Sequence, residues 1–170
     1  MTNDKKTRIS NNLVAFMRSE ETLTDEAAAF IRHWILTDKK GKLKADYDIW
    51  DMVLKRYLPE SRPVLFRSTA RKVDGKIASF TGTLRCAEKF SGGKGYLIIC
   101  DTKEFLQFSD MESPGNYSRS FFPVAELLRK EAENTPCKFS PKFLEEYTKE
   151  DEYITRVNLN CMYVCKWQSV

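Results

Sequence analysis

Several features that commonly identify a class of protein are scarce or missing in this sequence of 170 residues. It has no run of about 18 consecutive apolar residues, the length that a membrane-spanning helix requires. The N-terminal residues are polar and lack the apolar segment of a secretory signal. We therefore expect a cytoplasmic protein with no membrane partner.

Histidine, the general base of many enzymes, occurs once. His33 lies within a segment of helical periodicity and far along the chain from any candidate nucleophile. Chemistry of the serine–histidine–aspartate type needs a histidine beside the nucleophile, so we exclude that type of enzyme.

The five cysteines are an odd number and show none of the spacings typical of a disulfide framework. Cys161 and Cys165 fall in one expected strand, without the tight turn of a metal-binding knuckle. We expect the cysteines to be buried free thiols in a reducing compartment, and we expect no metal site.

Positive charge exceeds negative charge only slightly, with 28 Lys and Arg against 24 Asp and Glu and a net charge of +4. The basic residues are spread along the chain, whereas domains that bind nucleic acid usually concentrate them on one face. Composition therefore does not favour nucleic acid as a partner. Binding of nucleic acid through the basic N-terminal third stays as a third hypothesis behind the two developed below.

The length and the 42% content of hydrophobic residues predict one domain with a substantial core. We expect the polar first eight residues to be frayed. Helical periodicity then recurs in three segments, at residues 11–18, 27–35 and 45–58. Pro59 ends the third of these helices. We predict that residues 1–62 form a helical segment that packs on a core formed by residues 63–170.

Short apolar runs replace the helical pattern in the rest of the chain. Strands are expected at residues 64–67, 77–81, 96–100, 153–157 and 159–166. A helical turn anchored by Ala87 and Phe90 is expected, together with a helix at residues 124–133 and a short turn or helix at residues 143–147. Residues 105–108 form either another strand or the start of a loop, and residues 110–120 form an exposed loop. Short strands with interspersed helices predict an α+β fold whose sheet is mostly antiparallel.

Chemically versatile side chains stand at the boundaries of three expected strands. Arg67 ends the first strand, and Ser79 and Thr81 end the second. Glu150 and Glu152 lead into the strand that follows them. Arginine binds phosphate through paired N–H donors, and a carboxylate stabilises an oxocarbenium-like transition state at a sugar. Together these residues suit a phosphate-bearing sugar that reacts at its anomeric carbon, but residue types alone leave open that they are solvated strand ends.

The order of these residues resembles the arginine–serine–glutamate class of mono-ADP-ribosyltransferases, which includes bacterial toxins, phage enzymes and vertebrate ecto-enzymes. The matching segments are Val-Leu-Phe-Arg67, Ile-Ala-Ser79-Phe-Thr81 and Glu150-Asp-Glu152-Tyr-Ile. The resemblance extends over residues 63–166 and implies an ADP-ribosyltransferase-like split antiparallel β-sheet core with an N-terminal helical segment. It implies transfer of ADP-ribose from NAD to a protein side chain, with release of nicotinamide and without a metal.

The resemblance assigns a role to each matching residue. Arg67 would contact the phosphates and ribose of NAD, and the backbone at Ser68 would hold the nicotinamide amide. Ser79 would orient the catalytic glutamate, while Thr81 would support the pocket. Phe90 would lie over or beside nicotinamide, although its residue type and position suit a core aromatic equally.

Two glutamates complete the expected site. Glu152 would hydrogen-bond the nicotinamide ribose and stabilise the oxocarbenium ion, and Glu150 would position or deprotonate the incoming nucleophile. A glutamate at the earlier position is associated in this family with arginine acceptors, so the resemblance favours an arginine of a protein, for example a host protein in the host cytoplasm. Glu145 and Glu146 lie nearby, but only Glu150 and Glu152 directly precede an apolar strand.

The sequence departs from the family pattern at two positions. Ser68 follows the first arginine where many members have glycine, and the bulky Phe80 occupies the middle of the second motif. These departures motivate an alternative hypothesis, a catalytically inactive ADP-ribosyltransferase-like module that binds a protein partner.

Overall fold

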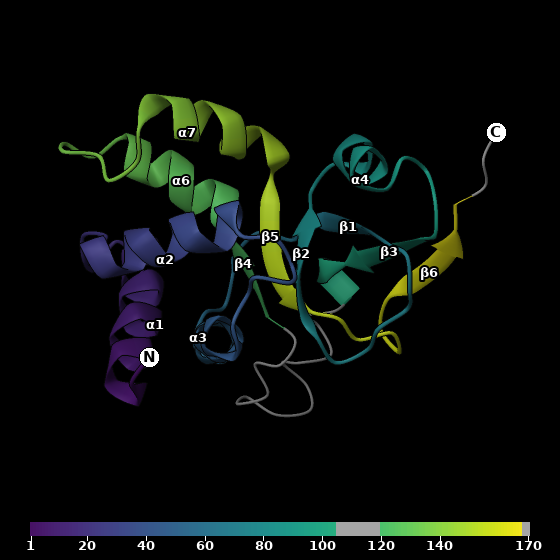
Figure 1. The fold of residues 1–170 in the computed structure, drawn as a ribbon, viewed down its shortest axis with the longest axis horizontal. Coiled ribbons are helices and arrows are strands. Elements are labelled where there is room, and N and C mark those ends of the chain that lie inside the picture. The colour runs from purple at the N-terminus through teal and green to yellow at the C-terminus, as the bar shows by residue number, and fades with distance from the viewer. Residues whose placement is uncertain (105–119, 168–170) are drawn as a thin grey trace.

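The computed structural model describes residues 1–104 and 120–167. The fold is α+β, as predicted, with a six-stranded antiparallel sheet and with most of the helices gathered at one end of it (Figure 1). The strand or loop expected at residues 105–108 lies outside the described residues, as does the loop expected at residues 110–120 apart from its last residue. That residue, Ser120, is buried rather than exposed, because its hydroxyl donates a hydrogen bond to the backbone carbonyl of Tyr57.

Three helices form the N-terminal part of the chain: α1 (Asn3–Met17), α2 (Asp25–Leu36) and α3 (Lys44–Leu54). The prediction that the first eight residues are frayed is wrong, because Thr2 caps α1 and its hydroxyl accepts a hydrogen bond from the Lys5 amide. The third helix ends at Leu54 rather than at residue 58, so it finishes well before the proline expected to stop it.

An aromatic cluster holds these helices against the sheet. Trp50 of α3 packs on Phe30 and Trp34 of α2, with ring centroids 5.3 and 5.5 Å away. On another side Trp50 packs on Phe122 of the sheet, at 5.4 Å. Burial of a large apolar side chain stabilises a fold by ~1.5–3 kcal/mol, so this cluster firmly fixes α2 and α3 relative to the strands.

The strands are β1 (Val64–Thr69), β2 (Ile77–Thr81), β3 (Tyr96–Asp101), β4 (Phe121–Pro123), β5 (Glu152–Arg156) and β6 (Tyr163–Lys166). They lie in the order β4-β5-β2-β1-β3-β6, and every neighbouring pair is antiparallel. β4 was not predicted, because all three of its residues are buried and so short a run shows no alternation. The strand expected at residues 159–166 is wrong over its first half, since β6 begins at Tyr163.

The sheet consists of two halves that meet between β1 and β2. One registered pair, Phe66 with Thr81, joins these two strands, whereas six pairs join β1 to β3 and five join β2 to β5. Figure 1 shows the strands of the two halves running in different directions. We call the junction at Phe66 and Thr81 the seam. Arg67 and Ser79 lie within two residues of this pair.

The remaining helices are α4 (Leu84–Ser91), α6 (Val124–Ala132), α7 (Pro141–Tyr147) and a 3-10 turn at Thr148–Glu150. α4 is longer than the helical turn that the sequence predicts, and it ends where Gly92 adopts a left-handed conformation with φ of 59°. No helix in the described part of the chain is long and apolar enough to cross a membrane.

The five cysteines are free thiols, as predicted. Their expected burial is confirmed only for Cys100, where desolvation raises the pKa of the thiol to about 12. Cys165 is exposed and the other three are partly exposed. Cys161 does not share a strand with Cys165, because the chain turns just before β6 through a 3.1 Å hydrogen bond from the Cys161 amide to the Asn158 carbonyl.

Candidate functional site

The residues singled out by the sequence motifs converge on one cavity of about 220 Å³ beside the seam. It is lined by Phe66, Arg67, Ser68, Ser79, Phe80, Thr81, Ala87, Phe90, Glu150 and Glu152. All seven predicted site residues are among them. The strand order explains the convergence, because β2 lies between β1 and β5 and brings its hydroxyls next to both. We call this space the carboxylate cavity.

Glu152, the first residue of β5, receives a hydrogen bond from outside the sheet. Its Oε1 accepts from the indole Nε1 of Trp34 at a distance of 3.2 Å. Desolvation raises the pKa of the Glu152 carboxyl group, and hydrogen bonding by Ser79 and Trp34 lowers it. The positive charges of Lys42 and Arg67 lower it further. The Ser79 hydroxyl falls short of full hydrogen-bond geometry, so Trp34 makes the better-defined contact.

Arg67 is fixed by the strand that it faces. Its Nη1 donates a hydrogen bond of 2.6 Å to the backbone carbonyl of Ser79. Desolvation lowers the pKa of the Arg67 guanidinium, while electrostatic interactions with Tyr47 and Glu152 raise it. Because an arginine stays protonated in proteins, Arg67 brings a positioned positive charge to the cavity.

The turn between Glu150 and Glu152 is held by the end of β2. The Thr81 hydroxyl donates to the Glu150 carbonyl at 2.8 Å, and the Gly82 amide donates to the Asp151 carbonyl at 3.1 Å. Asp151 has a left-handed φ of 47°, and a Cβ at Gly82 would lie 2.1 Å from Asp151 Oδ2. A side chain at position 82 would therefore displace the Asp151 carboxylate, and Thr81, which also lines the cavity, holds the same turn in place.

Glu150 is partly buried and lines the carboxylate cavity. Desolvation raises the pKa of its carboxyl group, and the charge of Glu152 adds to the effect. Glu150 also lines a groove between α4 and α7 that contains Glu145 and Glu146. Those two glutamates do not line the cavity with Arg67, so Glu150 and Glu152 are the pair that the structure brings to it.

Ser68 and Phe90 lie on the side of the cavity that faces α4. The Ser68 hydroxyl donates to the Ala87 carbonyl at 2.6 Å and accepts from the indole N–H of Trp167 at 3.0 Å. The Phe90 side chain is 65% exposed, so its interpretation as a core aromatic is wrong. Ala87, at 1% exposed, anchors α4, and Phe90 stands at the rim of the cavity.

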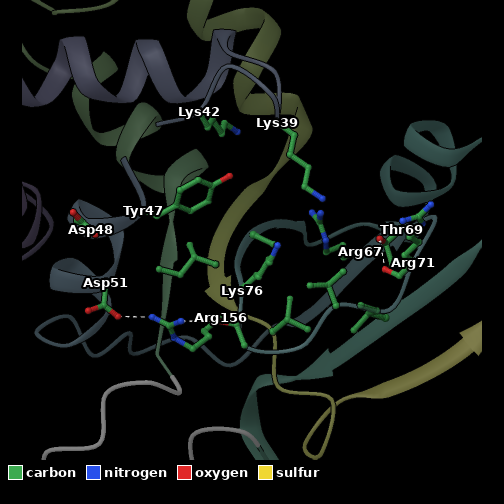
Figure 2. Close-up of a pocket in the computed structure, with 16 residues that line it drawn as sticks. Lys39, Lys42, Tyr47, Asp48, Asp51, Arg67, Thr69, Arg71, Lys76 and Arg156 are labelled. Carbon is green, nitrogen blue, oxygen red and sulfur yellow. Dashed lines mark hydrogen bonds and ion pairs between the residues drawn. The ribbon is translucent and has the colours of Figure 1, made fainter. Parts of the chain in front are cut away.

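A larger cavity of about 660 Å³ also has Arg67 in its lining (Figure 2). Its basic lining residues are Lys39, Lys42, Arg67, Arg71, Lys76 and Arg156. Arg156 is neutralised by an ion pair with Asp51, drawn as a dashed line in Figure 2. Within residues 1–104 and 120–167, Lys39, Arg71 and Lys76 form no ion pair, so the cavity is positive. We call it the basic cavity, and Arg67 connects it to the carboxylate cavity.

Trp34 and Lys42, from the N-terminal helical segment, interact with Glu152 and were not predicted as site residues. Trp34 falls in the helical segment expected at residues 27–35 and is buried, and its N–H points at Glu152. Lys42 lies between the helices expected at residues 27–35 and 45–58, and its Nζ lies 3.8 Å from the centroid of the Trp34 ring. The sequence feature that could have indicated a polar contact of Trp34 is its indole N–H, since the N–H of a buried tryptophan usually finds a hydrogen-bond acceptor. The sequence does not show which acceptor, because Glu152 is 118 residues away.

Comparison of the chain with protein-family models, curated proteins and solved structures gave no match. Among the residues that the structure describes, no group of three or more His, Cys, Asp or Glu side chains is arranged to hold a metal ion. The chemistry of the site is therefore inferred from the residues that line the two cavities.

Proposed function

We propose that the protein is an NAD-dependent mono-ADP-ribosyltransferase that transfers ADP-ribose to a protein side chain, with arginine as the favoured acceptor. One observation supports this most strongly. Arg67, Ser79 and Glu152 come from three different strands, in the order of the family motifs, and line one cavity. The two halves of the sheet, joined by a single registered pair, accord with the split sheet that the resemblance implies.

The two connected cavities suit the two ends of NAD. The nicotinamide ribose would occupy the carboxylate cavity, with Phe90 at its rim, and the diphosphate and adenosine would occupy the basic cavity. Arg67 lines both cavities, so its guanidinium is available to the phosphates where the ligand passes from one to the other. Basic side chains around a diphosphate compensate its negative charge.

The residues of the carboxylate cavity suit cleavage of the bond between the ribose C1′ and the nicotinamide nitrogen. The bonding electrons leave with the nitrogen, so nicotinamide departs neutral and positive charge develops on the ribose. The Glu152 carboxylate stabilises that charge, and it does so only when it is ionised. The acceptor nitrogen then bonds to C1′ and gives up a proton. Glu150, whose pKa is raised by desolvation, is suited to accept that proton.

The test is incubation of the purified chain with labelled NAD and cell lysate. We expect label on protein, and we expect Glu152→Ala to abolish it together with NAD hydrolysis. Glu150→Ala should lose transfer to protein and keep residual hydrolysis of NAD. Glu146→Ala, on the exposed part of α7, is the matched control and should behave as the wild type. Absence of label, or transfer that survives Glu152→Ala, would refute the proposal.

An inactive binding module remains the alternative proposal, motivated by Ser68 and Phe80. The Ser68 hydroxyl is held by Ala87 and Trp167, and the Phe80 side chain is only 3% exposed, in a hydrophobic cluster made mainly of strand residues. A thermal-shift titration separates the two functions, because a ligand that binds the folded state raises its apparent stability. We expect stabilisation by millimolar NAD, and its absence would favour the module.

A further inference from the structure

Trp34 links the N-terminal helices directly to the proposed catalytic carboxylate. It lies on α2, is 1% exposed, and donates its indole N–H to Glu152 Oε1 at 3.2 Å. The hydrogen bond crosses from the helical part of the molecule to the first residue of β5. A buried indole N–H usually finds an acceptor, and the acceptor of Trp34 is the carboxylate that the proposed reaction requires to be ionised.

The surroundings of Trp34 fix the direction of its N–H. Tyr47 and Trp50 contact the indole edge-to-face, with ring centroids 5.7 and 5.5 Å away. Lys42 lies over the ring with its Nζ 3.8 Å from the centroid, a cation–π contact that also places its ammonium in the lining of the basic cavity. An indole held on several sides has little freedom to turn, so it presents a donor of fixed position to Glu152.

We infer that Trp34 is a positioning residue that holds the Glu152 carboxylate in its orientation at the cavity, which makes α2 a structural part of the site. The consequence for catalysis rests on the proposed function, whereas the coupling between the two side chains does not. Trp50 provides a natural contrast within the described residues. It is an equally buried tryptophan of the same cluster, but its Nε1 has no hydrogen-bond partner there.

The hydrogen bond from Trp34 should lower the pKa of the Glu152 carboxyl group. Glu152 is faced by the charges of Arg67 and Lys42, by the Trp34 N–H as donor, by the Ser79 hydroxyl and by the acidic Glu150. A donor to a carboxylate favours the charged form, so removal of the Trp34 N–H should raise the pKa of Glu152 above its value in the wild type. The charged neighbours are unchanged by that substitution.

The first experiment needs no enzymatic activity. The chain has three tryptophans, so ¹⁵N labelling of tryptophan gives three indole N–H signals, which Trp→Phe variants assign. We expect the Trp34 signal to shift with pH through a transition that Glu152→Gln abolishes. The Trp50 signal, and that of Trp167, whose N–H is bound to the Ser68 hydroxyl, should lack this transition. A Trp34 signal without a transition that depends on Glu152 would overturn the inference.

The second experiment measures the catalytic consequence by comparing Trp34→Phe with Phe139→Leu, a substitution of a buried aromatic residue that lines neither cavity. A hydrogen bond to a charged group is typically worth about a ten-fold effect or more, so Trp34→Phe should lower kcat by about that factor with little change in KM for NAD. The acidic limb of its pH–rate profile should move to higher pH. Phe139→Leu should leave the kcat and the pH profile near those of the wild type.

The outcomes of these two experiments are distinguishable. Equal losses in both variants, with no movement of the pH profile, would mean that Trp34 is only a core residue and would overturn the inference. If the wild type neither transfers nor hydrolyses NAD, the proposed function fails, while the NMR titration still decides whether Trp34 and Glu152 are coupled. If Trp34→Phe does not fold, that titration on the wild-type chain and on Glu152→Gln decides the inference without it.

Discussion

The two cavities that share Arg67 are built differently. The carboxylate cavity, of about 220 Å³, contains two carboxylates, and backbone or indole contacts hold its polar residues Arg67, Thr81 and Glu152 in place. The basic cavity, of about 660 Å³, is lined by long cationic side chains, several from loops. Fixed groups suit a reaction whose charge develops at one atom, whereas adaptable cations suit the binding of an anion. Changes in the first cavity should therefore alter rate, and changes in the second should alter affinity.

The largest expected effect is at Glu152 in the carboxylate cavity. Glu152→Gln keeps the shape and removes the charge, so NAD cleavage should fall by about 100-fold or more, the range found for loss of a group that stabilises a transition state. Affinity for NAD, measured by calorimetry, should change little. If Glu152→Gln loses NAD affinity together with the rate of NAD cleavage, the carboxylate cavity determines affinity as well as rate.

Arg67 belongs to both cavities, so its substitution should affect both quantities. Arg67→Lys keeps a positive charge but loses the planar fork of donors and its bond to the Ser79 carbonyl. We expect the KM for NAD to rise and kcat to fall, each by about ten-fold. Steady-state kinetics on NAD hydrolysis measures both. A change in KM alone or in kcat alone would show that Arg67 acts through only one of the two cavities.

Lys39 should affect affinity alone. It lines the basic cavity, so Lys39→Ala should raise the KM for NAD by about three-fold at low salt, with unchanged kcat and a smaller effect at high salt. Lys40 is the matched control, since it is exposed on the same loop and does not line the cavity. Equal effects of the two substitutions would indicate general charge attraction rather than a site.

The smallest expected effect is that of Glu152→Gln on the pH dependence of protein stability. Desolvation raises the pKa of Glu152 above its ordinary value of 4.5, so the folded state binds this proton more tightly than the unfolded state. The free energy of unfolding that this group contributes therefore falls as pH rises from 4.5 through the raised pKa. Glu152→Gln should unfold at a temperature about 2 °C higher than the wild type at pH 7.

The same measurement at low pH provides the check on this stability difference. Below pH 4.5 the wild-type carboxyl group is protonated in both states, so the two melting temperatures should converge. Glu146→Gln, on the exposed part of α7, controls for the general effect of removing one negative charge. A destabilised Glu152→Gln at pH 7 would mean that the hydrogen bond from Trp34 outweighs the desolvation of the carboxylate.

The sequence predicted the parts of this molecule that depend on local pattern or on motif order. The α+β class followed from the change of periodicity after Pro63, and the seven predicted site residues all line one cavity. β4 could not be predicted because three buried residues have no period of their own, and they become a strand only by pairing with β5. The second half of α1 was expected as the helix at residues 11–18, but its first half was missed because its first turns are polar and depend on the cap at Thr2.

Contacts between distant segments account for the part of the site that the sequence did not reveal. Trp34 fits an apolar stripe, and its periodicity correctly predicts burial. The choice of Glu152 as its acceptor depends on how α2 docks against β5, which is set by the aromatic cluster around Trp50. No sequence pattern points to Lys42, because its position over the Trp34 ring depends on how the loop between α2 and α3 folds.

The seam is a weak connection between the two halves of the sheet that carry the site residues. One registered pair connects the halves of the sheet, so separating them at Phe66 and Thr81 disrupts fewer backbone hydrogen bonds than opening the ladder between β1 and β3. Arg67 belongs to one half, and Ser79 and Glu152 to the other. A ligand that contacts both sides would therefore act as a crosslink between two otherwise weakly joined sheets. Its binding should slow amide hydrogen exchange in both halves, including residues that it does not touch.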